Sequence, residues 1–189
     1  MQIDDDIKAS LEVLAAGGLI LYPTDTVWGI GCDSTNATAV EKIYALKNRN
    51  AKKSMIVLIA EEEDILDYVD HQRALVFDFI KGIQKPVTVI YSRAKNLATN
   101  LINEDGSIGI RIVKDPFCRM LIKKFGKPIV STSSNVSGYP PPTNFEDIDI
   151  KIKNGVDYIV QHRQNDITPA KPSTVIKLND DDSFTVIRD

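Results

Sequence analysis

The first third of the chain switches between helical and extended hydrophobic patterns. Apolar residues recur at helical spacing over residues 3–14, and Gly17-Gly18 ends this pattern because glycine readily adopts the left-handed conformation of a helix stop. Residues 19–22 form an apolar run typical of a buried strand, and the proline and small polar residues of 23–26 break regular structure after it. A second helix is expected to begin near residues 36–38 and to reach Lys47, so that its last turn delivers a cation.

The rest of the chain continues to alternate between the two kinds of element. Strands are predicted over residues 54–60, 86–91, 107–113, 128–132, 157–161, 173–178 and 183–188. Helices are predicted over residues 61–68, 71–83, 115–125 and 145–152, with a proline-rich loop over 139–143. Isoleucines alternate with Gly109 and Arg111, so Arg111 is expected to face a cleft or solvent. The interleaved elements predict an α/β fold with a mixed sheet, in a single domain over residues 1–189.

The composition is that of an ordinary globular protein, with 43% hydrophobic and 26% charged residues. Its two cysteines form no CxxC pair and it has two histidines, so no metal site is expected. The start of the chain lacks the basic residues and the apolar run of a secretion signal, and no stretch reaches the roughly 18 apolar residues of a membrane span. These features predict a cytoplasmic protein without membrane contact.

The net charge of −3 conceals separate acidic and basic segments. Acidic residues gather at both ends of the chain and over 61–70, whereas basic residues gather over 47–53 and 111–127. Basic runs of this kind often form a solvated face, and they also suit the binding of a polyanion. Charge by itself leaves both interpretations open.

Residues 29–34, with the sequence GIGCDS, resemble the start of a dinucleotide-binding fingerprint, but serine replaces its third glycine. The alternative is that Gly29 and Gly31 let the chain turn between a strand and a helix. The sequence contains no HExxH, GxSxG or CxxC motif, so a histidine-based catalyst is not expected.

Hydroxyl, amide and cationic side chains lie instead at the predicted strand ends. They are Thr24, Thr26, Lys47, Arg49, Arg111, Ser133, Asn135, Thr143, Ser173 and Arg188. Without an evident nucleophile, they suit a site that binds a phosphorylated substrate and stabilises developing charge.

Six segments, taken in order, resemble the YrdC/TsaC family of threonylcarbamoyl-AMP synthases. They are YPTDTVWGIG at 22–31, KNR at 47–49, GSIGIRI at 106–112, STSSNVSG at 131–138, PSTVI at 172–176 and VIR at 186–188. The resemblance spans the chain and implies the family's fold, a twisted mixed sheet with flanking helices and a concave cationic cleft. A KxR segment or a lone SxN often occurs by chance, but both in order, behind YPTDTV and ahead of PSTV, make a specific combination.

The resemblance implies an enzyme that condenses L-threonine, bicarbonate and ATP into threonylcarbamoyl-AMP and pyrophosphate, for threonylcarbamoyladenosine in tRNA. Threonine's own amine captures carbon dioxide or bicarbonate, and the resulting carboxylate attacks the α-phosphorus of ATP, so no protein nucleophile is needed. Mg²⁺ is expected to accompany ATP, held largely by phosphate oxygens and water. The implied macromolecular partners are tRNA or double-stranded RNA and separate threonylcarbamoyl transferase proteins.

The resemblance also assigns residue roles. The implied catalytic residues are Lys47, Arg49, Ser133 and Asn135. The implied L-threonine contacts are Thr26, Leu58, Arg111, Ser133 and Ser173. The implied nucleotide contacts are Lys47, Arg49, Asn50, Lys53, Asn135, Thr143 and Arg188. A guanidinium such as that of Arg111 suits a carboxylate because two donors meet two oxygens.

The sequence departs from the family pattern at several positions. Ser54-Met55 replaces a proline-leucine pair, Trp28 replaces a tyrosine, and Leu58 stands where some relatives have a histidine. A non-enzymatic RNA-binding protein of the same fold is the alternative, using residues 47–53 and 111–127 to follow a phosphate backbone. Pyrophosphate release that requires threonine and bicarbonate distinguishes the enzyme from the binding protein.

Overall fold

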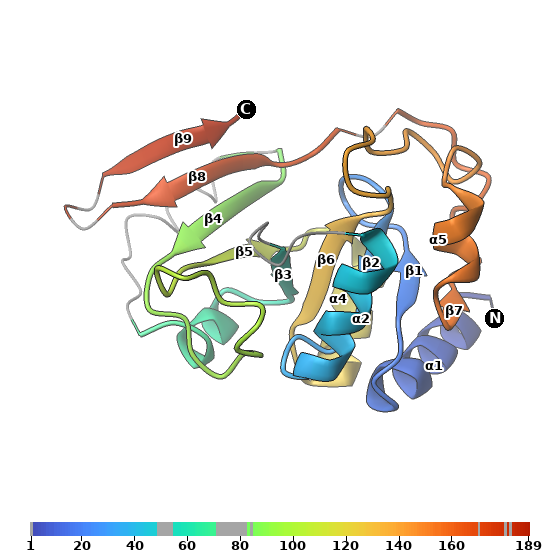
Figure 1. Ribbon diagram of the computed structural model, residues 1–189, viewed down its shortest axis with the longest axis horizontal. Helices are drawn as coiled ribbons and strands as arrows, with labels where there is room; N and C mark the ends of the chain where they lie inside the picture. Colours follow the sequence, from blue (N-terminus) through green and yellow to red (C-terminus); the bar gives the residue numbers. More distant parts are fainter. Residues whose placement is uncertain are drawn as a thin grey trace.

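The chain forms a mixed β-sheet with helices packed against it (Figure 1). The computed structural model describes residues 2–48, 55–70, 83, 85–169, 171–179, 181 and 183–189. The strands within these ranges are β1 (Ile20–Tyr22), β2 (Gly29–Gly31), β3 (Ile56–Ile59), β4 (Val87–Tyr91), β5 (Ile108–Ile112), β6 (Ile129–Ser133), β7 (Tyr158–Ile159), β8 (Thr174–Leu178) and β9 (Phe184–Arg188). The helices are α1 (Gln2–Ala15), α2 (Ala37–Lys47), the 3₁₀-helix η1 (Glu63–Asp67), α4 (Pro116–Phe125) and α5 (Ile150–Asn154).

The strand order in the sheet is β7-β1-β2-β6-β3-β5-β4-β8-β9. The pairs β1–β7, β3–β5 and β4–β8 are parallel, and the other neighbouring pairs are antiparallel. The register places Leu58 of β3 beside Arg111 of β5, and Ile56 of β3 beside Ser131 of β6. The sheet is therefore mixed, as predicted, and strands β3, β5 and β6 lie at its centre.

Capping residues fix the ends of the longer helices. The Asn36 side chain accepts a hydrogen bond from the amide of Ala39 at the start of α2, and Asp115 accepts one from the amide of Cys118 at the start of α4. Gly126 ends α4 in a left-handed conformation with φ of 72°. The helices predicted over these segments are confirmed. No helix in the described ranges is both long enough and apolar enough to cross a membrane.

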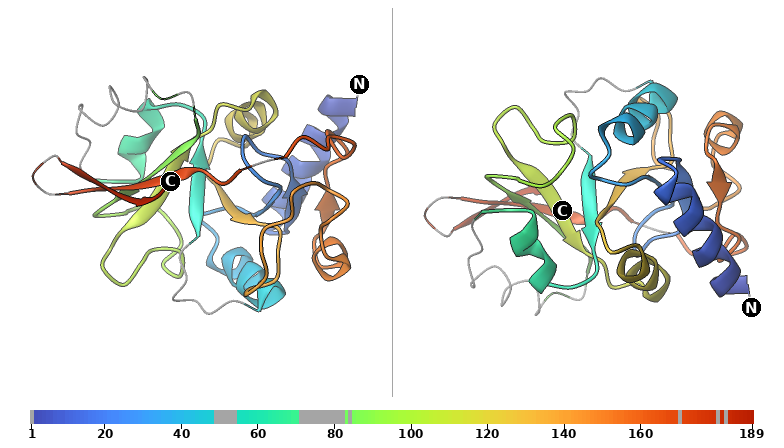
Figure 2. Two further views of the ribbon diagram at one scale, coloured as in Figure 1. Left: turned by 90° about the horizontal axis from the view of Figure 1, so that it is seen from above. Right: turned by 90° about the horizontal axis from the view of Figure 1, so that it is seen from below.

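Alternation along the strands divides the hydrophobic core into two layers. Leu21 and Val57 point into one layer, where they pack with the buried side of α2. Their neighbours Ile20 and Leu58 point into the other layer, where they pack with α1 and α4. Figure 2 shows α2 and α4 on opposite sides of the sheet.

Helices α1 and α4 cover only part of their face of the sheet. The covered part includes Leu58 of β3 and Ile129 of β6, which pack against apolar side chains of the two helices. Two residues away along these strands, on the same face, Ile56 and Ser131 line a cavity. The candidate site lies on this open part of the face.

Residues 29–31 differ from both interpretations of the GIGCDS segment. They form strand β2, which pairs antiparallel with β1 and β6. Glycine is needed there because a Cβ on Gly31 would lie 2.7 Å from Cε1 of Tyr22 and 2.9 Å from the carbonyl oxygen of Val130. Both interpretations, a turn and a dinucleotide-binding loop, are therefore wrong. Close packing between strands explains why residue 31 is a glycine.

Several predicted elements are shorter than expected. The helix predicted over 61–68 is the 3₁₀-helix η1, and the strand predicted over 157–161 is the two-residue β7. The helix predicted over 145–152 begins at Ile150, because Asp149 caps it by accepting a hydrogen bond from the amide of Lys151. The helix predicted over 71–83 lies, except for residue 83, outside the described residues.

Candidate functional site

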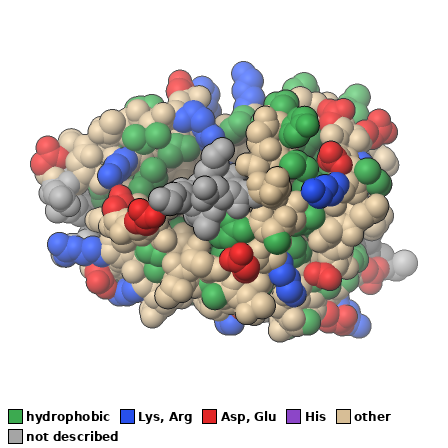
Figure 3. Space-filling model, viewed as in Figure 1, with side chains coloured by type: hydrophobic (Ala, Val, Ile, Leu, Met, Phe, Trp, Pro, Cys, Tyr) green, Lys and Arg blue, Asp and Glu red, His purple; other side chains and the backbone are tan. Residues whose placement is uncertain are grey.

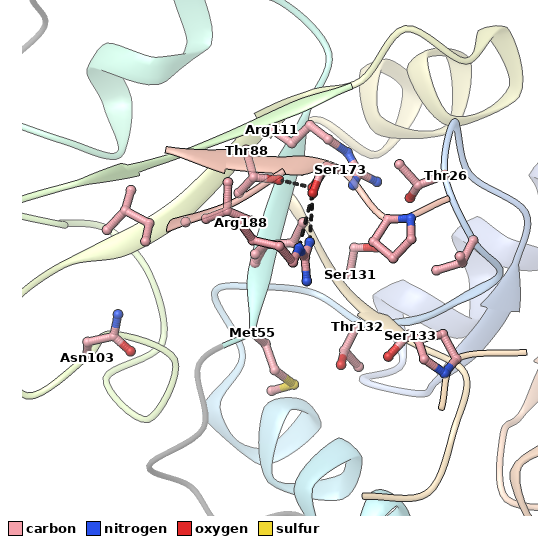
Figure 4. A pocket seen from close by; sticks show the side chains of 17 residues that line it. Thr26, Met55, Thr88, Asn103, Arg111, Ser131, Thr132, Ser133, Ser173 and Arg188 are labelled. Atoms are coloured by element: carbon pink, nitrogen blue, oxygen red, sulfur yellow. Dashed lines mark hydrogen bonds between the residues drawn. The ribbon is translucent and has the colours of Figure 1, made fainter. Parts of the chain in front are cut away.

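A cavity of about 340 Å³ opens on the uncovered part of the sheet (Figure 4). Strands β3 to β6 and β8 supply its floor, and the loop after β1 and the segment before β8 supply its walls. The lining residues are Thr26, Val27, Met55, Ile56, Thr88, Ile90, Asn103, Gly109, Arg111, Ser131, Thr132, Ser133, Pro141, Pro172, Ser173, Val175 and Arg188. Five predicted contacts, Thr26, Arg111, Ser133, Ser173 and Arg188, thus lie around one cavity.

The loop after β1 presents the hydroxyl of Thr26 to the cavity. The Thr24 hydroxyl donates its proton to the carbonyl oxygen of Val27 at 2.8 Å. It lies 3.0 Å from the Thr26 hydroxyl and also accepts the Thr26 amide at 3.0 Å. Because a hydroxyl has one proton, Thr26 is the donor in the Thr24–Thr26 bond. The lone pairs of Thr26 therefore remain available to accept a hydrogen bond from a ligand.

Arg111 lies deep in the wall beside Thr26 (Figure 4). It projects from β5, and its side chain is 3% exposed. Its Nη2 lies 3.0 Å from Oδ1 of Asp25, whose side chain is 9% exposed. This ion pair means that the guanidinium enters the cavity with its charge already balanced on one side.

A further part of the wall lies where β8 begins and β9 ends. The Ser173 hydroxyl lies 2.8 Å from the Thr88 hydroxyl of β4, and both side chains are buried. Arg188 donates from Nε at 3.3 Å and from Nη2 at 2.8 Å to the carbonyl oxygen of Ser173. The Arg188 guanidinium is thus held at the rim of the cavity by the backbone of residue 173 (Figure 4).

Lys47 reaches the site from the other side of the sheet. It is the last residue of α2 and is fully buried. Its Nζ donates to the carbonyl oxygens of Ser133 and Asn135, the latter at 2.6 Å. The ammonium lies beneath the turn that follows β6, and Lys47 is not among the described residues that line the cavity.

The turn after β6 is closed by Asn135. Its Oδ1 accepts a hydrogen bond from the Ser133 hydroxyl at 2.5 Å, and its Nδ2 donates to the carbonyl oxygens of Val136 and Tyr139. Asn135 and Thr143 line a second cavity of about 360 Å³, which shares Pro141 with the first. The proline-rich loop therefore stands between two adjoining hollows, with Ser133 on one side and Asn135 on the other.

The structure does not bring every predicted residue into the cavities. Leu58 is fully buried under the helices and is absent from the described linings, so the geometry gives no support to a threonine contact there. Arg49, Asn50 and Lys53 lie outside the described residues. The cations among the described lining residues of the first cavity are Arg111 and Arg188, so the cationic character of the cleft stays a prediction.

Sequence reasoning missed the residues that support the site. Asp25 was part of the YPTDTV segment but received no role, although it contacts Arg111. Thr88 and Gly109 also line the cavity. Alternation along residues 107–113 places Gly109 on the face that carries Arg111, whereas the position of Thr88 depends on the pairing of β4 with β5.

The two cysteines are unsuited to nucleophilic chemistry. Both are buried, and burial raises the pKa of each thiol well above its usual range. The nearby carboxylates of Asp115 and Asp25 raise the pKa of Cys118 further. At neutral pH neither thiol is therefore a thiolate, and the site can position reactants but offers no cysteine nucleophile.

Comparison with known proteins places the chain among named relatives. A model of the Sua5/YciO/YrdC family, described as telomere recombination, matches residues 12–189. The threonylcarbamoyl-AMP synthase of Photobacterium profundum is 36% identical over 143 residues, which cover 72% of this chain and 76% of that protein. The threonylcarbamoyl-AMP synthase of Pseudoalteromonas translucida is 32% identical over 178 residues, covering 93% and 94%.

A solved structure has the same fold. The P. abyssi Sua5 protein in complex with L-threonine is 22% identical, with a TM-score of 0.81 over 91% of this chain. The match covers 50% of that protein, so this chain spans about half its length. The likeness confirms the predicted fold, a mixed sheet with flanking helices.

Proposed function

The chain belongs to the Sua5/YciO/YrdC family, and from this premise we propose that it is an L-threonylcarbamoyladenylate synthase. It condenses L-threonine, bicarbonate and ATP into threonylcarbamoyl-AMP, pyrophosphate and water, for threonylcarbamoyladenosine in tRNA. The family model and the two named synthases support this assignment over most of the chain. The chain acts as one domain over residues 1–189.

The observation that carries the proposal is that Arg111 and Thr26 line the same cavity, which is large enough for an amino acid. The cavity volume of about 340 Å³ lies within the range of small-molecule sites. The Arg111 guanidinium suits the α-carboxylate of threonine, and the Thr26 hydroxyl suits its amine as a hydrogen-bond acceptor. Ser133 and Ser173 also line the cavity and complete the proposed threonine contacts.

The reaction needs positioning more than a protein nucleophile. The amine of threonine captures carbon dioxide or bicarbonate, and the new carboxylate attacks the α-phosphorus while pyrophosphate leaves. Ser133 and Asn135 lie where the two hollows meet, so they are placed to hydrogen-bond the nucleotide and the threonylcarbamoyl group. Loss of one donor that acts in the transition state is expected to cost about 2 to 4 kcal/mol.

The proposed nucleotide contacts come from several segments of the chain. Lys47 and Arg49 hold the triphosphate, and Asn50, Lys53, Thr143 and Arg188 line the nucleotide side. Arg188 does so from the rim of the first cavity and Thr143 from the second cavity. Lys47 contributes positive charge and holds the carbonyl oxygens of the turn that carries Ser133 and Asn135. The loop over 139–143 limits access of water to the labile carbamate.

Magnesium enters this proposal with the nucleotide. In the described residues, no group of three or more His, Cys, Asp or Glu side chains could hold a metal ion. The ion would be carried largely by phosphate oxygens and water, and it would neutralise phosphate charge when bound. The residues of this chain would then bind the phosphates and orient them.

Ion pairs neutralise part of the basic surface that the non-enzymatic RNA-binding alternative would use. Of the basic segment 111–127, Arg119 and Lys123 pair with Glu61, and Lys127 pairs with Asp33. Figure 3 shows Lys and Arg side chains interspersed with Asp and Glu on the face it presents. The proposal also includes binding of tRNA or double-stranded RNA, contact with threonylcarbamoyl transferase proteins and a cytoplasmic location.

Incubation with labelled bicarbonate, ATP and each natural amino acid tests the proposal. We expect pyrophosphate release and label incorporation that require threonine. The Arg49→Ala variant is expected to lose about 10²–10³-fold in kcat/KM, since a phosphate-binding cation is removed. The Arg93→Ala variant, which changes an exposed arginine outside the described linings, is its control. Pyrophosphate release independent of threonine would contradict the assignment.

A further inference from the structure

The buried ion pair between Asp25 and Arg111 sits against the proposed threonine end of the cavity. Arg111 lines the cavity, whereas Asp25 lies behind it and is not among the described lining residues. The two side chains are 3% and 9% exposed, and Nη2 lies 3.0 Å from Oδ1. Screening by water is weak at such a depth, so Asp25 strongly affects the charge that Arg111 presents.

Asp25 is also held by the segment that directly follows the strand carrying Arg111. Its Oδ2 accepts a hydrogen bond from the backbone amide of Lys114 at 3.2 Å. Lys114 follows β5 closely, and β5 contains Arg111. The carboxylate and the guanidinium therefore keep a set relation to each other, so their contact belongs to the wall itself.

The contact leaves two buried donors of Arg111 without a hydrogen-bond partner in the described part of the chain. Within the described residues, neither Nε nor Nη2 of Arg111 makes a hydrogen bond, and neither does Oδ1 of Asp25. The pair is thus joined by charge, while the N–H groups do not point along the Nη2–Oδ1 contact. Nε and Nη2 form the edge of a guanidinium that binds a carboxylate through two parallel hydrogen bonds.

The proposed reaction brings anionic substrates close to the buried Arg111. Bicarbonate and the phosphates of ATP are anions, and a buried arginine without a counter-charge would attract them to the threonine end. Asp25 balances the charge of Arg111, and Nε and Nη2 of this cavity-lining side chain stay buried without a hydrogen-bond partner among the described residues. A zwitterionic amino acid adds no net charge to the neutral pair of Asp25 and Arg111, whereas a simple anion adds a net negative charge.

We propose that Asp25 is a specificity-determining residue, which acts through Arg111 to admit α-amino acids and to exclude simple anions from the threonine end of the cavity. The inference rests on the proposed function for the identity of the amino acid. Its central element, suppression of anion binding at Arg111 by Asp25, can be measured without catalysis.

The test compares two ligands on purified protein by calorimetry. L-Threonine is the zwitterion, and 3-hydroxybutanoate is the same molecule without the ammonium group. In the Asp25→Asn variant, we expect 3-hydroxybutanoate to bind about tenfold more tightly than in the wild type, because a negative charge beside Arg111 is gone. Threonine binding is not expected to strengthen, so the preference for the zwitterion falls by at least the same factor.

Two matched variants separate this effect from a general loss of charge. Asp33→Asn removes a carboxylate of similar burial that pairs with Lys127 outside the cavity, and it is expected to leave both affinities unchanged. Asp25→Glu keeps the charge and is expected to retain the wild-type preference. If Asp25→Asn does not fold, Asp25→Ser provides the same loss of charge in a smaller side chain.

The kinetic readout is a rise in KM for threonine as bicarbonate or ATP is raised in Asp25→Asn, with a smaller change in kcat. If a folded variant with a neutral residue 25 binds 3-hydroxybutanoate with unchanged or weaker affinity, the inference is overturned. Absence of threonine-dependent pyrophosphate release in the wild type would instead refute the proposed function. A gain in binding of 3-hydroxybutanoate would still support the role of Asp25 in that case.

Discussion

One face of the sheet has two parts that differ in what lies above the strands. Under α1 and α4, Leu58 and Ile129 are fully buried against apolar side chains of the helices. On the same strands and the same face, Ile56 and Ser131 line the open cavity. The strands are continuous between the two parts, so the cover of helices decides whether a position serves stability or ligand binding.

The comparison also shows which elements give the open part its chemistry. Its polar groups come from the loop after β1, from strands β4, β5 and β6, and from the start of β8 and the end of β9. Substitutions under the helices should therefore reduce stability first, and substitutions in the open part should reduce activity first. The following variants test that division.

The largest effect on stability is expected from Phe117→Ala in α4. Phe117 is 3% exposed and packs in the covered layer, so its truncation leaves a cavity. The free energy of unfolding should fall by about 3–5 kcal/mol in urea titrations. Ile90→Ala in the cavity floor is the matched variant, and it should cost less than half as much because Ile90 is partly exposed. Equal losses would abolish the distinction between the two parts.

Lys47→Met is expected to have the largest effect on activity relative to stability. Methionine keeps most of the buried volume but leaves the carbonyl oxygens of Ser133 and Asn135 without the ammonium donor. The value of kcat/KM should fall by about 10²–10³-fold, through loss of charge and of order in the turn after β6.

The control for Lys47 is available on the same helix. Lys42 donates from Nζ to the carbonyl oxygen of Gly17 at 2.7 Å, outside the described linings of both cavities. Lys42→Met should lower the unfolding free energy by about 1 kcal/mol and leave kcat/KM unchanged. If both methionine variants lost activity equally, the turn after β6 would not be the reason.

Two glycines allow the same substitution to be made in each environment. At Gly31 a Cβ would meet the Tyr22 ring at 2.7 Å and a backbone oxygen at 2.9 Å, so Gly31→Ala should cost about 1–3 kcal/mol of stability. At Gly109 the nearest atoms are a methyl of Ile56 at 3.0 Å and one of Thr88 at 3.3 Å, in the cavity floor. Gly109→Ala should therefore reduce kcat/KM with a smaller loss of stability. Thermal unfolding and steady-state kinetics on both variants check this.

The sequence predicted elements with strong local determinants and missed those set by packing. Helices α2 and α4 were found because Asn36, Asp115 and Gly126 cap their ends, whereas β2 was missed because its glycines reflect the proximity of Tyr22 and Val130. The family motifs identified several side chains that the cavity brings together. The burial of Lys47 under a turn, the position of Leu58 under the helices and the contact of Asp25 with Arg111 depend on strand register, which local patterns do not reveal.

The smallest effect on stability is expected from a substitution at the contact between α1 and β7. The Tyr158 hydroxyl donates at 2.7 Å to the buried Asp6 carboxylate, which also accepts the amides of Gln161 and His162. Tyr158→Phe should lower the unfolding free energy at pH 7 by about 1 kcal/mol. It should leave kcat/KM unchanged, since Tyr158 packs in the covered part.

The pH dependence of this variant gives a sharper test. Burial, together with the hydrogen bond to Asp6 and the charge of the Asp6 carboxylate, raises the pKa of Tyr158 to about 12. Because the folded pKa exceeds the ordinary value of about 10, the stabilisation is complete below pH 10 and is lost as the pH rises toward 12. The stability difference between wild type and Tyr158→Phe should therefore narrow over that interval in urea titrations. A difference that stays constant up to pH 11.5 would show that the hydroxyl bond to Asp6 does not hold α1 on the sheet.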